Sequence, residues 1–288
     1  MKVCGFTIIR NAVKYDYPVL EAIKSVLPLC DKFIVLIGKS DDATEDLIRS
    51  IDSGKIEIHH SVWDDSLREG GRVLAVETDK AFDLISSEFD WAIYIQSDEL
   101  IHEDYHPEIK EKMLAYNEDE KIEGLLLKYL HFYGSYDYVG TSRKWYRNEI
   151  RIIKNNKSIR SYKDAQGFRI NGRKLNVART NAYVYHYGWV KDPVVQARKN
   201  KDFNKLWHDD NYVAKITDEI YNYSDIDALG RFSGSHPKVI LDRIKQKNWD
   251  FEGSKISQRS SIKDKVLYWF ELTTGIRLFE YRNYKVVN

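Results

Sequence analysis

The chain has 288 residues, 43% hydrophobic and 31% charged, which is enough apolar material for a folded core and excludes a disordered chain. Lys and Arg total 45 against 44 Asp and Glu, so the net charge of +1 argues against nucleic acid as a main partner. Two cysteines are too few for a disulfide framework, the first residues lack a signal-peptide pattern, and no apolar run approaches the ~18 residues of a membrane span. We therefore expect a cytoplasmic globular protein.

The first hundred residues alternate apolar strand-like runs with helical patterns. Strands are predicted at residues 3–9, 32–37, 56–60 and 91–96, and helices at 17–29, 43–51 and 71–85. Buried strands that alternate with helices are typical of βαβ units. The sequence thus predicts an α/β fold with a mainly parallel sheet flanked by helices.

The pattern changes after residue 104. The chain then predicts a helix at 104–116, a strand at 124–132, a turn-rich stretch at 133–142, strands at 150–154 and 182–189, and helices at 193–207, 237–247 and 262–274. We place a domain boundary near residue 190. This gives a catalytic domain over 1–190 and a mostly helical C-terminal extension over 191–288.

Polar residues follow each of the first four predicted strands. They are Arg10-Asn11, Ser40-Asp41-Asp42, Trp63-Asp64-Asp65 and Gln96-Ser97-Asp98-Glu99. Ligands of an open parallel sheet bind beyond the carboxyl ends of its strands, and carboxylates gathered there favour a hard cation such as Mg²⁺ or Mn²⁺, often shared with substrate phosphates. For Asp41 and Asp42, capping of the next helix is the alternative. No glycine-rich phosphate loop is present, which disfavours P-loop and dinucleotide folds.

Three stretches resemble the family 2 glycosyltransferases of the GT-A fold, and more narrowly the bacterial members that build lipopolysaccharide or capsule glycans. Residues 6–11 (FTIIRN) match the opening strand, residues 35–44 (VLIGKSDDAT) match the stretch ending in Ser-Thr-Asp-Gly-Thr, and residues 90–98 (DWAIYIQSD) match the strand ending in the Asp-x-Asp motif. The resemblance covers residues 3–190. It implies a GT-A fold, a nucleoside-diphosphate sugar donor, a divalent metal, and a hydroxyl acceptor on a glycan or glycolipid (lipopolysaccharide, O-antigen or capsule).

The same resemblance assigns roles to individual residues. Asp98 becomes the metal ligand, and His186, in the aromatic stretch 183–189, completes the metal site unless it is simply packed in the core. Gln96 replaces the first acid of the motif, and Ile37 and Gly38 stand where the family often places acids that read the base. The donor would be held by Arg10, Asn11, Ser40, Asp42, Trp63, Gln96, Lys191 and Arg198, where Lys191, Arg198 and the adjacent Lys199 could equally form a solvated basic helix face.

A general base must deprotonate the acceptor hydroxyl, and two carboxylates are candidates. Glu149 is flanked by Arg147 and Arg151, which would share its strand face, and pairing with them would lower its pKa and weaken it as a base. Asp164 is followed by Ala-Gln-Gly, which leaves room for a sugar. We therefore favour Asp164 over Glu149.

These patterns together predict an inverting, metal-dependent glycosyltransferase. The alternatives are a nucleotidyltransferase and, because Gln96 carries no charge, a catalytically silent carbohydrate-binding protein. Residues 263–287 combine basic and aromatic side chains. They predict either peripheral contact with the inner face of an anionic membrane, or packing on the catalytic domain or on a second subunit of a homo-oligomer.

Overall fold

The computed structural model describes residues 1–217, 219–224, 226–253 and 262–287. Its strands are β1 (Val3–Ile9), β2 (Lys32–Gly38), β3 (Ile56–Ser61), β4 (Trp91–Tyr94), β5 (Glu99–Ile101), β6 (Gly124–Tyr133), β7 (Ser135–Gly140), β8 (Asn148–Lys154), β9 (Ile159–Tyr162), β10 (Gly167–Ile170), β11 (Arg173–Trp189), β12 (Leu229–Arg231) and β13 (Tyr284–Val286). Its helices are α1 (Val19–Val26), α2 (Thr44–Arg49), α3 (Arg72–Asp83), α4 (His106–Ala115), α5 (Pro193–Asn204), α6 (Asp210–Val213), α7 (Leu241–Lys245) and α8 (Ile262–Thr274).

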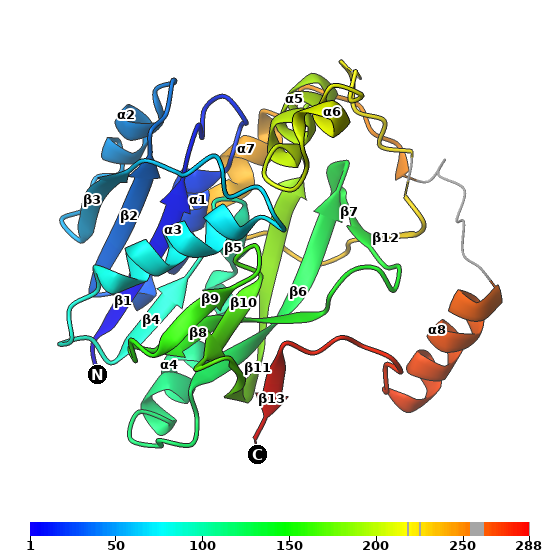
Figure 1. Ribbon diagram of the computed structural model, residues 1–288. Coiled ribbons are helices and arrows are strands. Elements are labelled where there is room, and N and C mark those ends of the chain that lie inside the picture. Colours follow the sequence, from blue (N-terminus) through cyan, green and yellow to red (C-terminus); the bar gives the residue numbers. More distant parts are fainter. Residues whose placement is uncertain (218, 225, 254–261, 288) are drawn as a thin grey trace.

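The main sheet has the strand order β3-β2-β1-β4-β8-β6-β11-β10-β9 (Figure 1). The first four of these strands run parallel, as predicted, and β6 runs parallel to β11. Strand β8 lies between β4 and β6 and is antiparallel to both, so the sheet is mixed. The predicted α/β class, with helices flanking the sheet, is confirmed, and the assignment to the GT-A fold stays a prediction.

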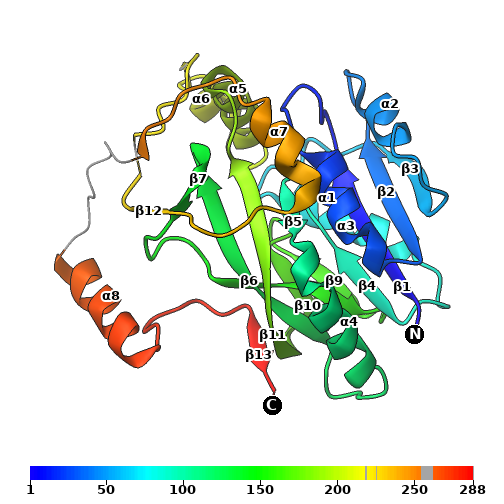
Figure 2. The ribbon, with the colours of Figure 1, turned by 180° about the vertical axis from the view of Figure 1, so that it is seen from behind.

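Each central strand contributes alternate residues to two separate cores. In β1, Val3 and Ile9 belong to one core, and Cys4, Phe6 and Ile8 belong to the other, as the two-residue repeat of a strand requires. Helix α3 covers the second core, while α1 and α4 cover the first (Figures 1 and 2). Because both faces are covered, β1 is buried along its whole length and reads as a continuous apolar run.

The prediction of turns at residues 133–142 was wrong in part. It contains β7, which pairs with β6 as an antiparallel hairpin. Gly134 makes this possible, because its φ of +71° lies in the left-handed region where other residues are strained. The sequence did not indicate this hairpin because β7 is short and half of its residues are polar or glycine.

The segment after residue 190 contains α5 to α8 and the short strands β12 and β13, which pair with β7 and β11. The domain boundary itself stays a prediction. Helix α8 stands apart from the sheet in Figures 1 and 2 and is fixed by Glu271, whose carboxylate pairs with Arg143 and Arg147. Trp269 on α8 and Phe279 just after it are exposed. Contact of this region with a membrane or a second copy stays a prediction.

Within the described ranges, no helix combines the length and the apolar character needed to cross a bilayer.

Candidate active site

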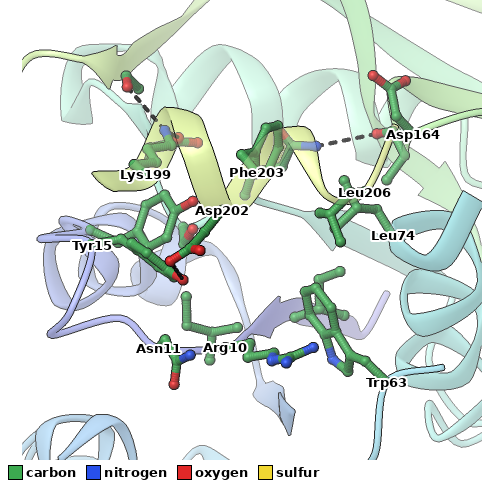
Figure 3. Close-up of a pocket in the computed structure, with 18 of the residues that line it drawn as sticks. Arg10, Asn11, Tyr15, Trp63, Leu74, Asp164, Lys199, Asp202, Phe203 and Leu206 are labelled. Atoms are coloured by element: carbon green, nitrogen blue, oxygen red, sulfur yellow. Dashed lines mark hydrogen bonds and ion pairs between the residues drawn. The ribbon is translucent and has the colours of Figure 1, made fainter. Parts of the chain in front are cut away.

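A cavity of about 900 Å³ opens at the carboxyl ends of β1 to β4, between these strand ends, helix α5 and the turn that joins β9 to β10. Figure 3 shows Arg10, Trp63, Lys199 and Asp164 around it. The cavity brings together these predicted site residues: Arg10, Asn11, Ser40, Trp63, Gln96, Asp98, Asp164 and His186. Asp42, Glu149, Lys191 and Arg198 are not among its lining residues.

Asp98 lines the cavity beside Lys199 and His186, and is 8% exposed. Its Oδ2 is 3.2 Å from the Lys199 ammonium, and its Oδ1 is 3.8 Å from His186 Nε2. Burial alone would raise the pKa of Asp98, but the positive charge of the adjacent Lys199 outweighs it and lowers the pKa to about 2. Asp98 is therefore an anion at neutral pH.

The three basic residues Lys191, Arg198 and Lys199 lie in three different environments. Lys199 on α5 is buried against Asp98 and also donates to the Gly188 carbonyl at 3.0 Å. Lys191 is fully buried, where desolvation lowers its pKa, and it donates to the Asp16 carbonyl. Arg198 points to solvent on the same helix as Lys199. Of these three residues, Lys199 is the one that contacts Asp98, and nothing in the sequence favours it over its neighbours.

Asp98 and His186 could hold a divalent ion between them. A Cβ on Gly188 would lie 2.6 Å from His186 Nε2 and 2.8 Å from Asp98 Oδ2, so this glycine keeps the space between the two side chains open. Across the described part of the chain, no group of three or more His, Cys, Asp or Glu side chains is placed to bind a metal. Two protein ligands fit Mg²⁺ or Mn²⁺, which commonly take their remaining ligands from substrate phosphates and water.

Asp164 lies in the four-residue turn between β9 and β10, where Lys163 and Ala165 adopt left-handed conformations. Two side chains distant in sequence fix this turn, Gln96 from the loop after β4 and Arg151 from β8. Gln96 Nε2 donates to the Ala165 carbonyl at 3.3 Å, and Arg151 Nη1 donates to the Gln166 carbonyl at 3.0 Å. Burial raises the pKa of Asp164. A carboxylate with a raised pKa on an anchored turn at the cavity wall suits a general base.

The expectation that Arg147 and Arg151 pair with Glu149 was wrong. Arg151 binds Glu99, and Arg147 binds Glu271 and Glu280. Glu149 is instead buried beside Gln166, and desolvation raises its pKa to about 8. Its Oε2 finds no hydrogen-bond partner among the described residues.

Another wall of the cavity contains four of the residues predicted to hold the donor, Arg10, Asn11, Ser40 and Trp63. Arg10 pairs with Asp65 at 2.6 Å and lies over the Trp63 ring. Ser40 Oγ accepts from the Asn11 amide, and Asn11 Oδ1 accepts from the Asp41 amide, so the loops after β1 and β2 are tied together.

Asp42 also links the segments that follow β1 and β2, although it does not line the cavity. Its carboxylate accepts from the backbone amides of Lys14 and Thr44, where Thr44 is the first residue of α2. Asp42 thus contacts the start of α2 from just outside the helix, whose N-cap position is Ala43.

Several cavity residues could not be recognised from the sequence because long-range packing brings them there. Arg68, in the loop before α3, donates to the Lys205 carbonyl and pairs with Asp210. Tyr15 donates to Asp202 at 2.8 Å, a contact visible in Figure 3. The cations that line the cavity are Arg10, Lys14, Lys39, Arg68, Arg151, Lys199 and Lys205, and Tyr146, Trp189 and Trp207 add aromatic surface.

Comparison with known proteins gives only distant similarity. No family model and no curated protein matches the chain. Among solved structures, S. aureus TarS is 14% identical with a TM-score of 0.41, over 75% of this chain and 42% of that one, so the chain spans less than half of TarS. Glucosyl-3-phosphoglycerate synthase from Mycobacterium tuberculosis, in complex with Mn²⁺, UDP and phosphoglyceric acid, is 21% identical over 45% of this chain and 43% of that one, with a TM-score of 0.30. The 4-diphosphocytidyl-2C-methyl-D-erythritol synthase from Anaerococcus prevotii is 11% identical over 71% and 94%, with a TM-score of 0.36.

Proposed function

We propose that this protein is an inverting glycosyltransferase that moves a sugar from a nucleoside-diphosphate sugar to a hydroxyl group of a cell-surface glycan or glycolipid. One observation carries the proposal. On one wall of the cavity, the ionised carboxylate of Asp98 lies beside His186 and the buried ammonium of Lys199. Asp164 lines another wall of the same cavity. The first group suits a diphosphate with its counter-ion, and the second suits deprotonation of an acceptor.

In this proposal the residues around Asp98 serve the leaving group. Asp98 and His186 would hold Mg²⁺ or Mn²⁺, and the bound ion would neutralise the charge of the diphosphate. Lys199 supplies a second positive charge at the same place, where negative charge develops as the bond to the diphosphate breaks. Arg10 and Trp63 would bind the nucleoside end of the donor, together with the loops joined by Asn11 and Ser40.

Asp164 would take the proton from the acceptor hydroxyl. The acceptor oxygen then forms the new bond at the anomeric carbon from the side opposite the departing diphosphate, and this single displacement inverts the configuration. Trp189, Trp207 and Tyr146 line the cavity and offer the flat apolar faces on which sugar rings pack. The proposal includes a role in the synthesis of lipopolysaccharide, O-antigen or capsule. It also includes a location at the inner face of the cell membrane.

The test is a screen of nucleoside-diphosphate sugars with Mn²⁺, measuring release of the nucleoside diphosphate. At least one donor is expected to be turned over, and Asp98→Asn should abolish the turnover. Release of pyrophosphate from a nucleoside triphosphate would instead indicate a nucleotidyltransferase. Binding of glycans with no nucleotide binding would indicate the silent carbohydrate-binding protein, and either result would overturn the proposal.

A further inference from the structure

His186 has a buried neighbour that is outside the cavity lining. β6 and β11 run side by side in parallel, and His131 and His186 are register partners on them. The two Nδ1 atoms are 3.3 Å apart, and His131 is 3% exposed. On its other side, His131 Nε2 is 2.8 Å from the carbonyl oxygen of Tyr146.

These two contacts determine which nitrogens carry protons. A carbonyl oxygen can only accept, so His131 Nε2 must be protonated and donate to Tyr146. In a neutral imidazole this leaves Nδ1 of His131 as an acceptor. The contact between the two Nδ1 atoms is then a hydrogen bond only if His186 carries its proton on Nδ1, which leaves His186 Nε2 with a free lone pair.

The surroundings of both rings agree with this assignment. His131 is stacked against Trp145 and Tyr129, with ring centroids 4.9 and 5.4 Å away, and is 3% exposed, as suits a neutral ring. His186 Nε2 is 3.8 Å from Asp98 Oδ1, which is too far for a hydrogen bond and so requires no proton on Nε2.

We propose that His131 is a positioning residue that holds His186 as its Nδ1–H tautomer, so that the bare Nε2 faces the cavity beside Asp98. A histidine binds a cation only through an unprotonated nitrogen, and the hydrogen bond made by the other ring nitrogen selects which one is free. The use of Nε2 as a metal ligand rests on the proposed function. The tautomer rests only on the two hydrogen bonds of His131.

The tautomer can be read directly by ¹⁵N–¹H NMR of the full chain labelled at histidine, with the His186 signals assigned by their loss in His186→Gln. In the unmodified protein at pH 7.5 without metal, Nδ1 of His186 should show the shift of a protonated nitrogen, and Nε2 that of a nitrogen with a lone pair. The reverse pattern would overturn the proposal without any variant of His131.

Two variants of His131 then test its part. His131→Leu removes the acceptor, so His186 should lose its single tautomer and Mn²⁺ affinity, measured by electron paramagnetic resonance with a nucleoside diphosphate present, should fall about 10–100-fold. His131→Asn keeps an oxygen near the place of Nδ1 and should restore both. His106→Leu is the matched control, because it also removes a ring nitrogen bound to a backbone carbonyl, that of Ser25, and should change neither.

The outcomes separate the two proposals. An unchanged His186 tautomer in folded His131→Leu would overturn the role of His131. A correct tautomer in an unmodified protein that binds no Mn²⁺, even with a nucleoside diphosphate, would support the role of His131 and count against the proposed function of the site.

Discussion

Arg151 and Glu99 form a two-bonded ion pair beneath the cavity, with Nε and Nη2 of the arginine each 2.8 Å from a carboxylate oxygen. Their side chains are 1% and 0% exposed. The third nitrogen of the same guanidinium donates to the Gln166 carbonyl in the turn that carries Asp164. The residue that follows Asp98 in the chain is thus connected, through Arg151, to the opposite wall of the cavity.

Breaking this pair should cost much more stability than breaking a surface pair. Glu99→Gln leaves the buried charge of Arg151 without its counter-charge, and we expect a loss of about 3–5 kcal/mol in the free energy of unfolding, measured by urea denaturation. Arg49→Met, which removes an exposed pair with Glu45, should cost less than about 1 kcal/mol. Equal losses in the two variants would contradict the structural role of the Arg151–Glu99 pair.

The two candidate bases should behave differently when neutralised. Asp164→Asn is expected to slow transfer about 10²–10⁴-fold with little change in donor affinity, because it removes the group that takes the proton. Glu149→Gln should slow it far less, because Glu149 lies outside the cavity lining. Rates with saturating donor and acceptor decide between them, and the opposite ranking would transfer the role to Glu149.

Glu149 should also make stability depend on pH. Its pKa is raised by burial from 4.5 to about 8, so the folded state binds a proton that the unfolded state has lost. The protein should therefore lose stability as the pH rises from about 5 to 8, by roughly 3–5 kcal/mol from this group. Glu149→Gln removes the titration, and its denaturation midpoint should change less with pH over the same interval. Parallel pH profiles for the two proteins would contradict the raised pKa.

Gly188 should be needed for metal and nucleotide binding because it has no side chain to fill the space beside Asp98 and His186. Gly188→Ala places a methyl group in the space between His186 Nε2 and Asp98 Oδ2, so Mn²⁺ and nucleoside-diphosphate binding should fall at least tenfold by calorimetry. Gly54→Ala, where a Cβ meets nothing within 4 Å, is the control and should bind normally. Normal binding by Gly188→Ala would show that this space is not used.

The sequence predicted most of what depends on local pattern and sheet geometry. Four strand ends converge as expected, and Asp98 and His186 do meet, because buried parallel strands deliver their carboxyl ends to one edge. The choice of Lys199 over Arg198 could not be predicted, since neighbouring residues of a helix differ by about 100° in direction and tertiary packing sets which one faces the site.

The environment of Glu149 was beyond local reasoning for a related reason. A strand pattern indicates which side chains share a face, but the partners of Arg147 and Arg151 come from segments more than 50 residues away. Gln96 is similar. Its missing charge raised the question of a silent site, whereas the structure shows its amide bound to the turn beside Asp164.

The most direct test of the proposed metal–diphosphate site is the melting temperature of the protein with UDP, GDP, CDP or ADP, in Mn²⁺ or in EDTA. A nucleoside diphosphate that is present at a hundred times its Kd stabilises the folded state by about 2.7 kcal/mol, or roughly 5 °C for a chain of this size. We expect that rise with Mn²⁺ for at least one nucleotide, little rise in EDTA, and no difference between the two in Asp98→Asn. Equal stabilisation with and without metal in the unmodified protein would contradict the account.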